Sequence, residues 1–185
     1  MQRLTLICAE EVNDVFKHTG IIRRIDDVGR LVIPKEIRRK FRIHDGDPIE
    51  IGEDGEFIAL RKYSALELDS ENTQRILRSF IKTTSHPVIL CSTTNALQAH
   101  GVSMKTPDLL SSELCDDLRK TDKDYLGYEI TVESRHKVAA LEKINICKSL
   151  EGALIIPQKS YGNPITETDR ECLKFCANMI AEFLS

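Results

Sequence analysis

A dense cluster of basic side chains lies in a short stretch near the beginning of this chain. Between Arg23 and Arg42 there are eight Lys or Arg residues and three acids, a local excess of five positive charges. Such an excess could bind the phosphates of nucleic acid, and a solvated charged face is the alternative. The eight candidate contacts are Arg23, Arg24, Arg30, Lys35, Arg38, Arg39, Lys40 and Arg42.

The spacing of the arginines indicates which of them can act together. Arg23 and Arg24 are consecutive in a segment with the composition of a strand, so their side chains leave on opposite faces. One is expected to face nucleic acid, while the other flanks it or pairs with Asp26 or Asp27. Two further arginines, at positions 38 and 39, lie about 100° apart on an expected helix and can share one phosphate-facing side.

The other residues with chemical potential are better explained by structural roles. Six acids between Asp45 and Glu56 lack the regular ligand spacing of a calcium loop, and we assign them to hairpin turns and solubility. Cys172 and Cys176 could bind metal beside a histidine, but their helical spacing favours core packing. The sequence contains no recognisable catalytic triad and no Gly-rich phosphate loop. We therefore expect no metal, no cofactor and no enzymatic activity.

The residues around the basic cluster have the pattern of a small β-β-α-β-β unit. Pro34 fits the first turn of a short helix, and the Gly-containing segment after Ile51 indicates a hairpin. The expected elements are strands at Gly20 to Ile25 and Arg30 to Ile33, a helix at Lys35 to Phe41, and strands at Ile49 to Ile51 and Phe57 to Leu60. A unit of about 45 residues is too small to bury an adequate core alone, so we expect an obligate dimer.

These residues resemble the swapped-hairpin DNA-binding domain of the AbrB family of bacterial transition-state regulators. The resemblance covers Thr19 to Arg39, Gly46 to Ile51 and Leu60 to Tyr63. It implies a dimeric β-barrel of two interleaved chains that binds double-stranded DNA. The positions that it implicates are Arg23, Arg24, Arg30, Arg38 and Arg39, with Lys35, Lys40 and Arg42 as supporting phosphate contacts. A sporulation regulator of this family also has a GAF-like domain, which implies control of transition-state or sporulation genes.

The whole chain is expected to have an α+β fold with four parts. Residues 1–17 form an N-terminal extension with roughly helical apolar spacing, although a frayed tail or a start codon assigned too early fits equally well. Residues 18–63 form the swapped-hairpin domain. Residues 64–85 form a linker with a helix at about 70–84. Residues 86–185 form a GAF-like regulatory domain, because their expected order is two strands, a helix, three strands and a helix.

Within this last part the apolar patterns place each element. The expected strands are His86 to Cys91, Ala96 to Gly101, Tyr128 to Val132, Val138 to Ile146 and Gly152 to Ile156. One helix is expected at Leu109 to Leu118, introduced by Thr106-Pro107-Asp108, and a final helix begins at Thr166 and ends near Leu184.

A GAF-type domain often holds a small molecule between its sheet and the covering loops. The candidate lining is Leu90, Cys91, Leu97, Leu126, Tyr128 and Leu154, and the same residues would form core if no signal molecule binds. By analogy with the sporulation regulator, this domain is also expected to join two dimers into a tetramer.

The charge, the cysteines and the apolar runs of the sequence indicate the compartment and the kind of partner of this protein. The net charge is −3, so only a local patch could meet phosphate. Six cysteines without C-x-x-C spacing, no secretory signal and no apolar run of about 18 residues indicate a cytoplasmic protein. Two other functions remain open: an antitoxin of a toxin-antitoxin pair, and a small-ligand sensor in which the hairpin only dimerises. Antitoxin tails are usually disordered, whereas residues 70–185 have enough apolar periodicity to fold.

Overall fold

The chain folds into two compact units, Met1–Tyr63 and Ser64–Ser185, which are described separately. This computed structural model describes residues 3–5, 19–54, 57–67, 70–120, 124–158 and 163–185. Within the described ranges no helix is long and apolar enough to cross a membrane.

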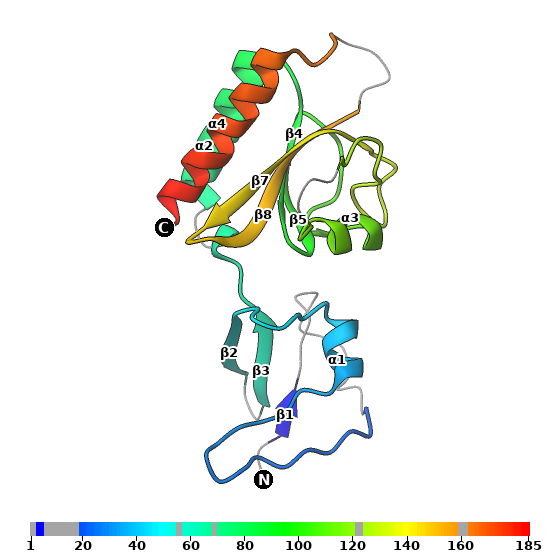
Figure 1. The fold of residues 1–185 in the computed structure, drawn as a ribbon, viewed down its shortest axis with the longest axis vertical. Coiled ribbons are helices and arrows are strands. Elements are labelled where there is room, and N and C mark those ends of the chain that lie inside the picture. Colours follow the sequence, from blue (N-terminus) through cyan, green and yellow to red (C-terminus); the bar gives the residue numbers. More distant parts are fainter. Residues whose placement is uncertain (1–2, 6–18, 55–56, 68–69, 121–123, 159–162) are drawn as a thin grey trace. The chain divides into compact units, whose positions relative to one another are not determined.

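The first unit is built on the predicted hairpin (Figure 1). Strands β2 (Ile49–Asp54) and β3 (Phe57–Lys62) are antiparallel, with Ile49 opposite Lys62. The hairpin prediction is therefore confirmed. The strand β1 (Arg3–Thr5) pairs in parallel with the other edge of β3. A helix was one of the alternatives left open for residues 1–17, and it does not hold at these three residues, because the free edge of β3 supplies backbone partners. The rest of that segment lies outside the described residues.

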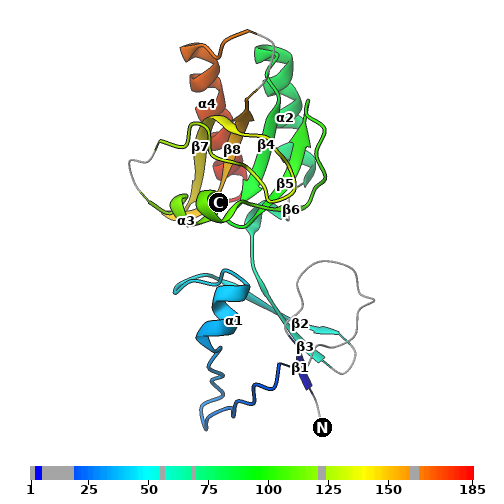
Figure 2. The same cartoon turned by 90° about the vertical axis from the view of Figure 1, so that its right-hand side faces the viewer.

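The segment between Thr19 and Pro34 is extended but forms no assigned strand (Figure 2). The predicted turn is present, but the predicted strands at 20–25 and 30–33 are absent from this single chain. A strand is defined by a hydrogen-bonded neighbour, and here the backbone bonding lies at the turn itself, where the Asp26 N–H donates to the Arg30 carbonyl at 3.1 Å. Their apolar side chains Ile22, Ile25 and Val32 are 84%, 59% and 71% exposed.

The second unit is a five-stranded antiparallel sheet with helices packed on it (Figures 1 and 2). In spatial order its strands are β6 (Asp108–Leu109), β5 (Asn95–His100), β4 (Val88–Ser92), β8 (Ser149–Pro157) and β7 (Val138–Ile146). Helices α2 (Ser70–Thr84) and α4 (Glu167–Phe183) lie side by side against one face, and α3 (Ser112–Asp117) lies against the other. A short 3-10 helix, η1 (Ala65–Glu67), precedes α2.

Alternating residues of the central strand β4 separate the two cores. Leu90 packs with α2 and α4, whereas Ile89 and Cys91 pack with α3, because successive side chains of a strand point to opposite faces. Each face of the sheet therefore has its own apolar layer, and the central strands are buried on both sides.

On the α3 side the predicted helix is present but starts later, and one predicted strand is wrong. The helix predicted at Leu109 to Leu118 starts only at Ser112, since Leu109 belongs to β6 and pairs with Asn95. Its cap is Ser111, whose hydroxyl accepts the Leu114 N–H at 3.2 Å. The strand predicted at 128–132 forms only isolated bridges, because its neighbours alternate between two different segments.

Candidate nucleic-acid interface

A tight turn positions the first group of basic residues. The Asp26 carboxylate accepts backbone N–H groups from Val28 at 3.2 Å and from Arg30 at 2.6 Å. Gly29 closes the turn with φ of +81°, a conformation that disfavours residues with a Cβ atom. Asp26 is therefore held by the backbone of the turn, and Arg30 leaves the chain directly after it.

The helix α1 (Lys35–Lys40) positions the second group. Pro34 precedes its first residue, and Ile37 is buried, so this one apolar side chain fixes which side of the short helix faces inward. Arg38, Arg39 and Lys40 fill the last turn, where cationic groups interact favourably with the helix dipole. Three positive charges are thus concentrated within one turn.

Arg38 and Arg39 have different surroundings although they are neighbours. Arg38 Nη1 lies 2.6 Å from Asp45 Oδ1, an ion pair that the sequence reasoning missed. The Arg38 side chain is 37% exposed, whereas Arg39 is exposed and makes no ion pair within the described part of the chain. Arg39 is therefore the more available of the two for an external phosphate.

The structure places most of the predicted contacts at the surface. The exposed members are Arg23, Arg24, Arg30, Lys35, Arg39 and Lys40, and the half-buried members are Arg38 and Arg42. Among the described residues neither of the consecutive arginines pairs with Asp26 or Asp27; the Arg23 guanidinium instead donates to the Ile22 carbonyl at 3.0 Å. The Lys40 ammonium lies 5.6 Å from the centre of the Phe41 ring.

The acids after the helix support local structure. Asp47 is nearly buried, receives the His44 N–H at 2.8 Å and lies 3.0 Å from Lys62 Nζ. Glu50 pairs with Arg61 across the hairpin. In the described ranges no group of three or more His, Cys, Asp or Glu could hold a metal ion. These contacts fit the predicted role of the acids in the hairpin.

The six residues proposed to line a ligand pocket do not come together. Leu90, Leu97 and Leu154 belong to the layer beneath α2 and α4, while Cys91 and Tyr128 belong to the opposite layer. The remaining residue, Leu126, is 60% exposed. A pocket that combines the two layers would have to pass through the sheet. The prediction placed Leu90 and Cys91 in the same pocket. Consecutive residues of a strand point to opposite faces of the sheet, so their side chains cannot line one pocket together.

Comparison with known proteins identifies the first unit. Residues 22–67 match the family model described as antidote-toxin recognition MazE, a bacterial antitoxin. The transition state regulatory protein AbrB of Bacillus subtilis (strain 168) is 51% identical over 47 residues, which cover 25% of this chain and 49% of AbrB. The N-terminal unit is an AbrB-like domain. The transition state regulator Abh of the same organism is 45% identical over 47 residues, 25% of this chain and 51% of Abh.

One similarity extends beyond the AbrB-like domain. Stage V sporulation protein T of Bacillus subtilis (strain 168) is 41% identical over 107 residues, covering 57% of this chain and 58% of that protein. The chain therefore matches about half to three fifths of the length of each of these relatives. The three names describe regulatory and sporulation proteins, and none describes an enzyme.

Proposed function

We propose that this protein is a DNA-binding transcriptional regulator that acts in the cytoplasm on transition-state or sporulation genes. The observation that carries the proposal is the exposure of basic side chains in the AbrB-like domain, on the turn and on the last turn of α1. Their targets would be the phosphates of double-stranded DNA, and sequence preference would come largely from the shape of the duplex. The names of the relatives support the same function.

The binding form would be a dimer with exchanged hairpins. Ile22, Ile25 and Val32 are exposed in one chain although their segments have the composition of strands. Pairing with the same segments of a second copy would satisfy their backbone groups and bury their side chains. Such a dimer would also present two copies of the basic cluster to one duplex.

The second unit would act as a GAF-like regulatory domain that joins two dimers into a tetramer. Its outer helix α4 exposes two large aromatic side chains, Phe175 at 63% and Phe183 at 59%. Apolar surface of this kind is available for contact with another chain. A small signal molecule bound to this unit could then change DNA affinity through the assembly.

An antitoxin is the second candidate, because the matching family model describes one. Antitoxins of this type would need a segment that folds against a toxin. Here residues 64–185 form a compact unit with two apolar layers of its own. A unit that is already folded fits regulation and assembly better than a toxin-binding tail.

The test is a titration of a pool of fluorescent DNA duplexes with the full chain. Fluorescence anisotropy measures the binding, and the titration is repeated at several salt concentrations. Arg39→Ala should weaken binding by about 1–3 kcal/mol and reduce the salt slope by about 0.9 for one lost phosphate contact. The matched control is Arg135→Ala, which removes an exposed arginine of the second unit. A correctly folded wild type that does not bind duplexes at low salt would refute the proposal.

A further inference from the structure

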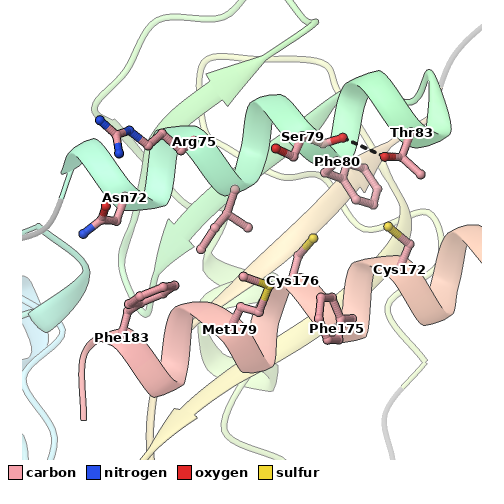
Figure 3. A pocket seen from close by; sticks show the side chains of 11 residues that line it. Asn72, Arg75, Ser79, Phe80, Thr83, Cys172, Phe175, Cys176, Met179 and Phe183 are labelled. Atoms are coloured by element: carbon pink, nitrogen blue, oxygen red, sulfur yellow. Dashed lines mark hydrogen bonds between the residues drawn. The ribbon is translucent and has the colours of Figure 1, made fainter.

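A groove runs between the outer sides of α2 and α4 (Figure 3). Its volume is about 440 Å³. The α2 side contributes mainly polar and cationic groups, whereas the α4 side contributes aromatic and sulfur-containing side chains. The α4 members are Cys172, Phe175, Cys176, Met179 and Phe183. Of the residues weighed as possible sites from the sequence, Cys172 and Cys176, which were assigned to core packing, lie in this groove.

Three sulfur atoms from a single helix line the groove. Cys172, Cys176 and Met179 are spaced four and then three residues apart, so they form one stripe along α4. Both cysteines are free thiols. Figure 3 shows them on the side of α4 that faces α2. In the sequence these residues form the pattern Cys-x3-Cys-x2-Met. The cysteine pair stands out in that pattern, whereas Met179 does not.

The two thiols are neighbours on one face of α4. Cys176 lies four residues after Cys172 in the helix, and both line the groove. The pair therefore presents two sulfur donors to the same space.

We propose that Cys172, Cys176 and Met179 form a binding site for a soft monovalent cation of the Cu(I) class. Thiolate and thioether sulfur are the ligands that select Cu(I). Zinc in a structural site takes four ligands from Cys, His, Asp and Glu, and the groove offers only two of that kind. The donor set therefore fits Cu(I) and not zinc.

The geometry of a helix permits the two thiolates to share one ion. Side chains four residues apart have Cβ atoms about 5–6 Å from each other. If the metal–sulfur bonds are as long as zinc–thiolate bonds, about 2.3 Å, two of them in line span about 4.6 Å, which is close to this Cβ separation. The Met179 thioether one turn further along would act as the third, weaker ligand.

The protons and charges of the binding step balance. Each thiol releases one proton to solvent as its sulfur bonds the cation, so two protons leave for each ion bound. The resulting bis-thiolate complex has a net charge of −1. Arg75 lines the same groove from α2, where it forms an ion pair with Glu71.

The test is a competition titration of the full chain, kept reduced and anaerobic, against Cu(I) buffered by the chromogenic chelator bicinchoninate. The wild type should withdraw one equivalent per chain. Cys172→Ser and Cys176→Ser should each weaken retention at least ten-fold, and Met179→Leu, which keeps the side-chain volume, should weaken it several-fold. Cys147→Ser is the control, because Cys147 is an exposed thiol outside the groove.

Two results would overturn the site. The first is a folded wild type that withdraws no Cu(I) from the chelator. The second is Cys172→Ser with wild-type retention, and this variant is informative because Cys172 is only partly buried and serine is nearly isosteric. Circular dichroism of every variant checks that losses do not come from unfolding. The measurement needs no DNA, and it is made on the full chain because Phe175 and Phe183 of this groove also belong to the proposed contact between dimers.

Discussion

The imidazole Nε2 of His86 lies 3.4 Å from the Asp169 carboxylate, at the point where α4 begins. His86 follows α2 and precedes β4, so this contact joins the start of the last helix to the sheet. The same carboxylate accepts the Thr166 hydroxyl at 2.7 Å and the Thr166 N–H at 2.8 Å. With the Thr166 oxygen accepting the Asp169 N–H, the two residues form a complete capping box.

This carboxylate makes the second unit sensitive to acid. The Thr166 hydrogen bonds, and then the nearby His86, lower the pKa of Asp169 below its ordinary value of 3.8. Because the folded pKa is below the unfolded one, the stabilisation is complete above about pH 4 and is lost as the pH falls through the lowered pKa. Asp169→Asn should cost about 1 kcal/mol at neutral pH, and this difference should shrink in acid.

The difference in unfolding free energy between the wild type and Asp169→Asn is measured by urea denaturation between pH 2 and pH 7, with circular dichroism as the signal. Asp116→Asn is the control at neutral pH, since it removes an exposed carboxylate from the short helix α3. A cost for Asp169→Asn that stays constant down to pH 2 would show that the charge is not what stabilises the cap.

Gly152 is the position where a side chain is least tolerated in the central sheet. A Cβ atom there would lie 2.0 Å from the Cys91 carbonyl oxygen and 2.5 Å from the Leu66 side chain. Backbone of β4 would have to move, so Gly152→Ala should destabilise the second unit by about 3 kcal/mol in chemical denaturation. Gly52→Ala is the matched strand control, because a Cβ at Gly52 meets nothing within 4 Å. Equal stabilities of the two variants would contradict this packing.

Ile22 and Val32 provide a test of the exchanged dimer. Both are exposed in one chain, so a monomer should tolerate Ile22→Asp with Val32→Asp at little cost. In the proposed dimer the two carboxylates would be buried at the pairing segments, and the oligomer should dissociate. Light scattering coupled to size exclusion measures the mass. Val28→Asp, at the exposed turn, is the control and should keep the wild-type mass.

Asp45 restrains a candidate DNA contact. Its side chain is 97% exposed while it holds Arg38, so the pair contributes less than about 1 kcal/mol to stability. Asp45→Asn should leave unfolding unchanged and tighten DNA binding several-fold at low salt, since it frees Arg38 and removes a negative charge that repels phosphate. Anisotropy titrations measure the change. Weaker binding by Asp45→Asn would mean that the ion pair orients Arg38 for DNA.

Elements with strong local signals were predictable from the sequence. The helix expected at about 70–84 is α2, and the capping pattern from Thr166 to Asp169 marks the start of α4. The nine apolar-patterned residues Val138–Ile146 form β7 as expected. In each case periodicity and end signals agree within one continuous segment, so no distant partner is needed to define the element.

The sequence by itself determined the AbrB-like basic cluster, the hairpin after it and the helices of the second unit. Only the tertiary structure decided that Leu90 and Cys91 face different layers, that Arg38 is held by Asp45, and that three sulfurs line one groove. The reason is physical: hydrogen bonding within a helix or a hairpin is local, whereas the face on which a side chain is buried and the partner that it meets depend on segments distant in the chain.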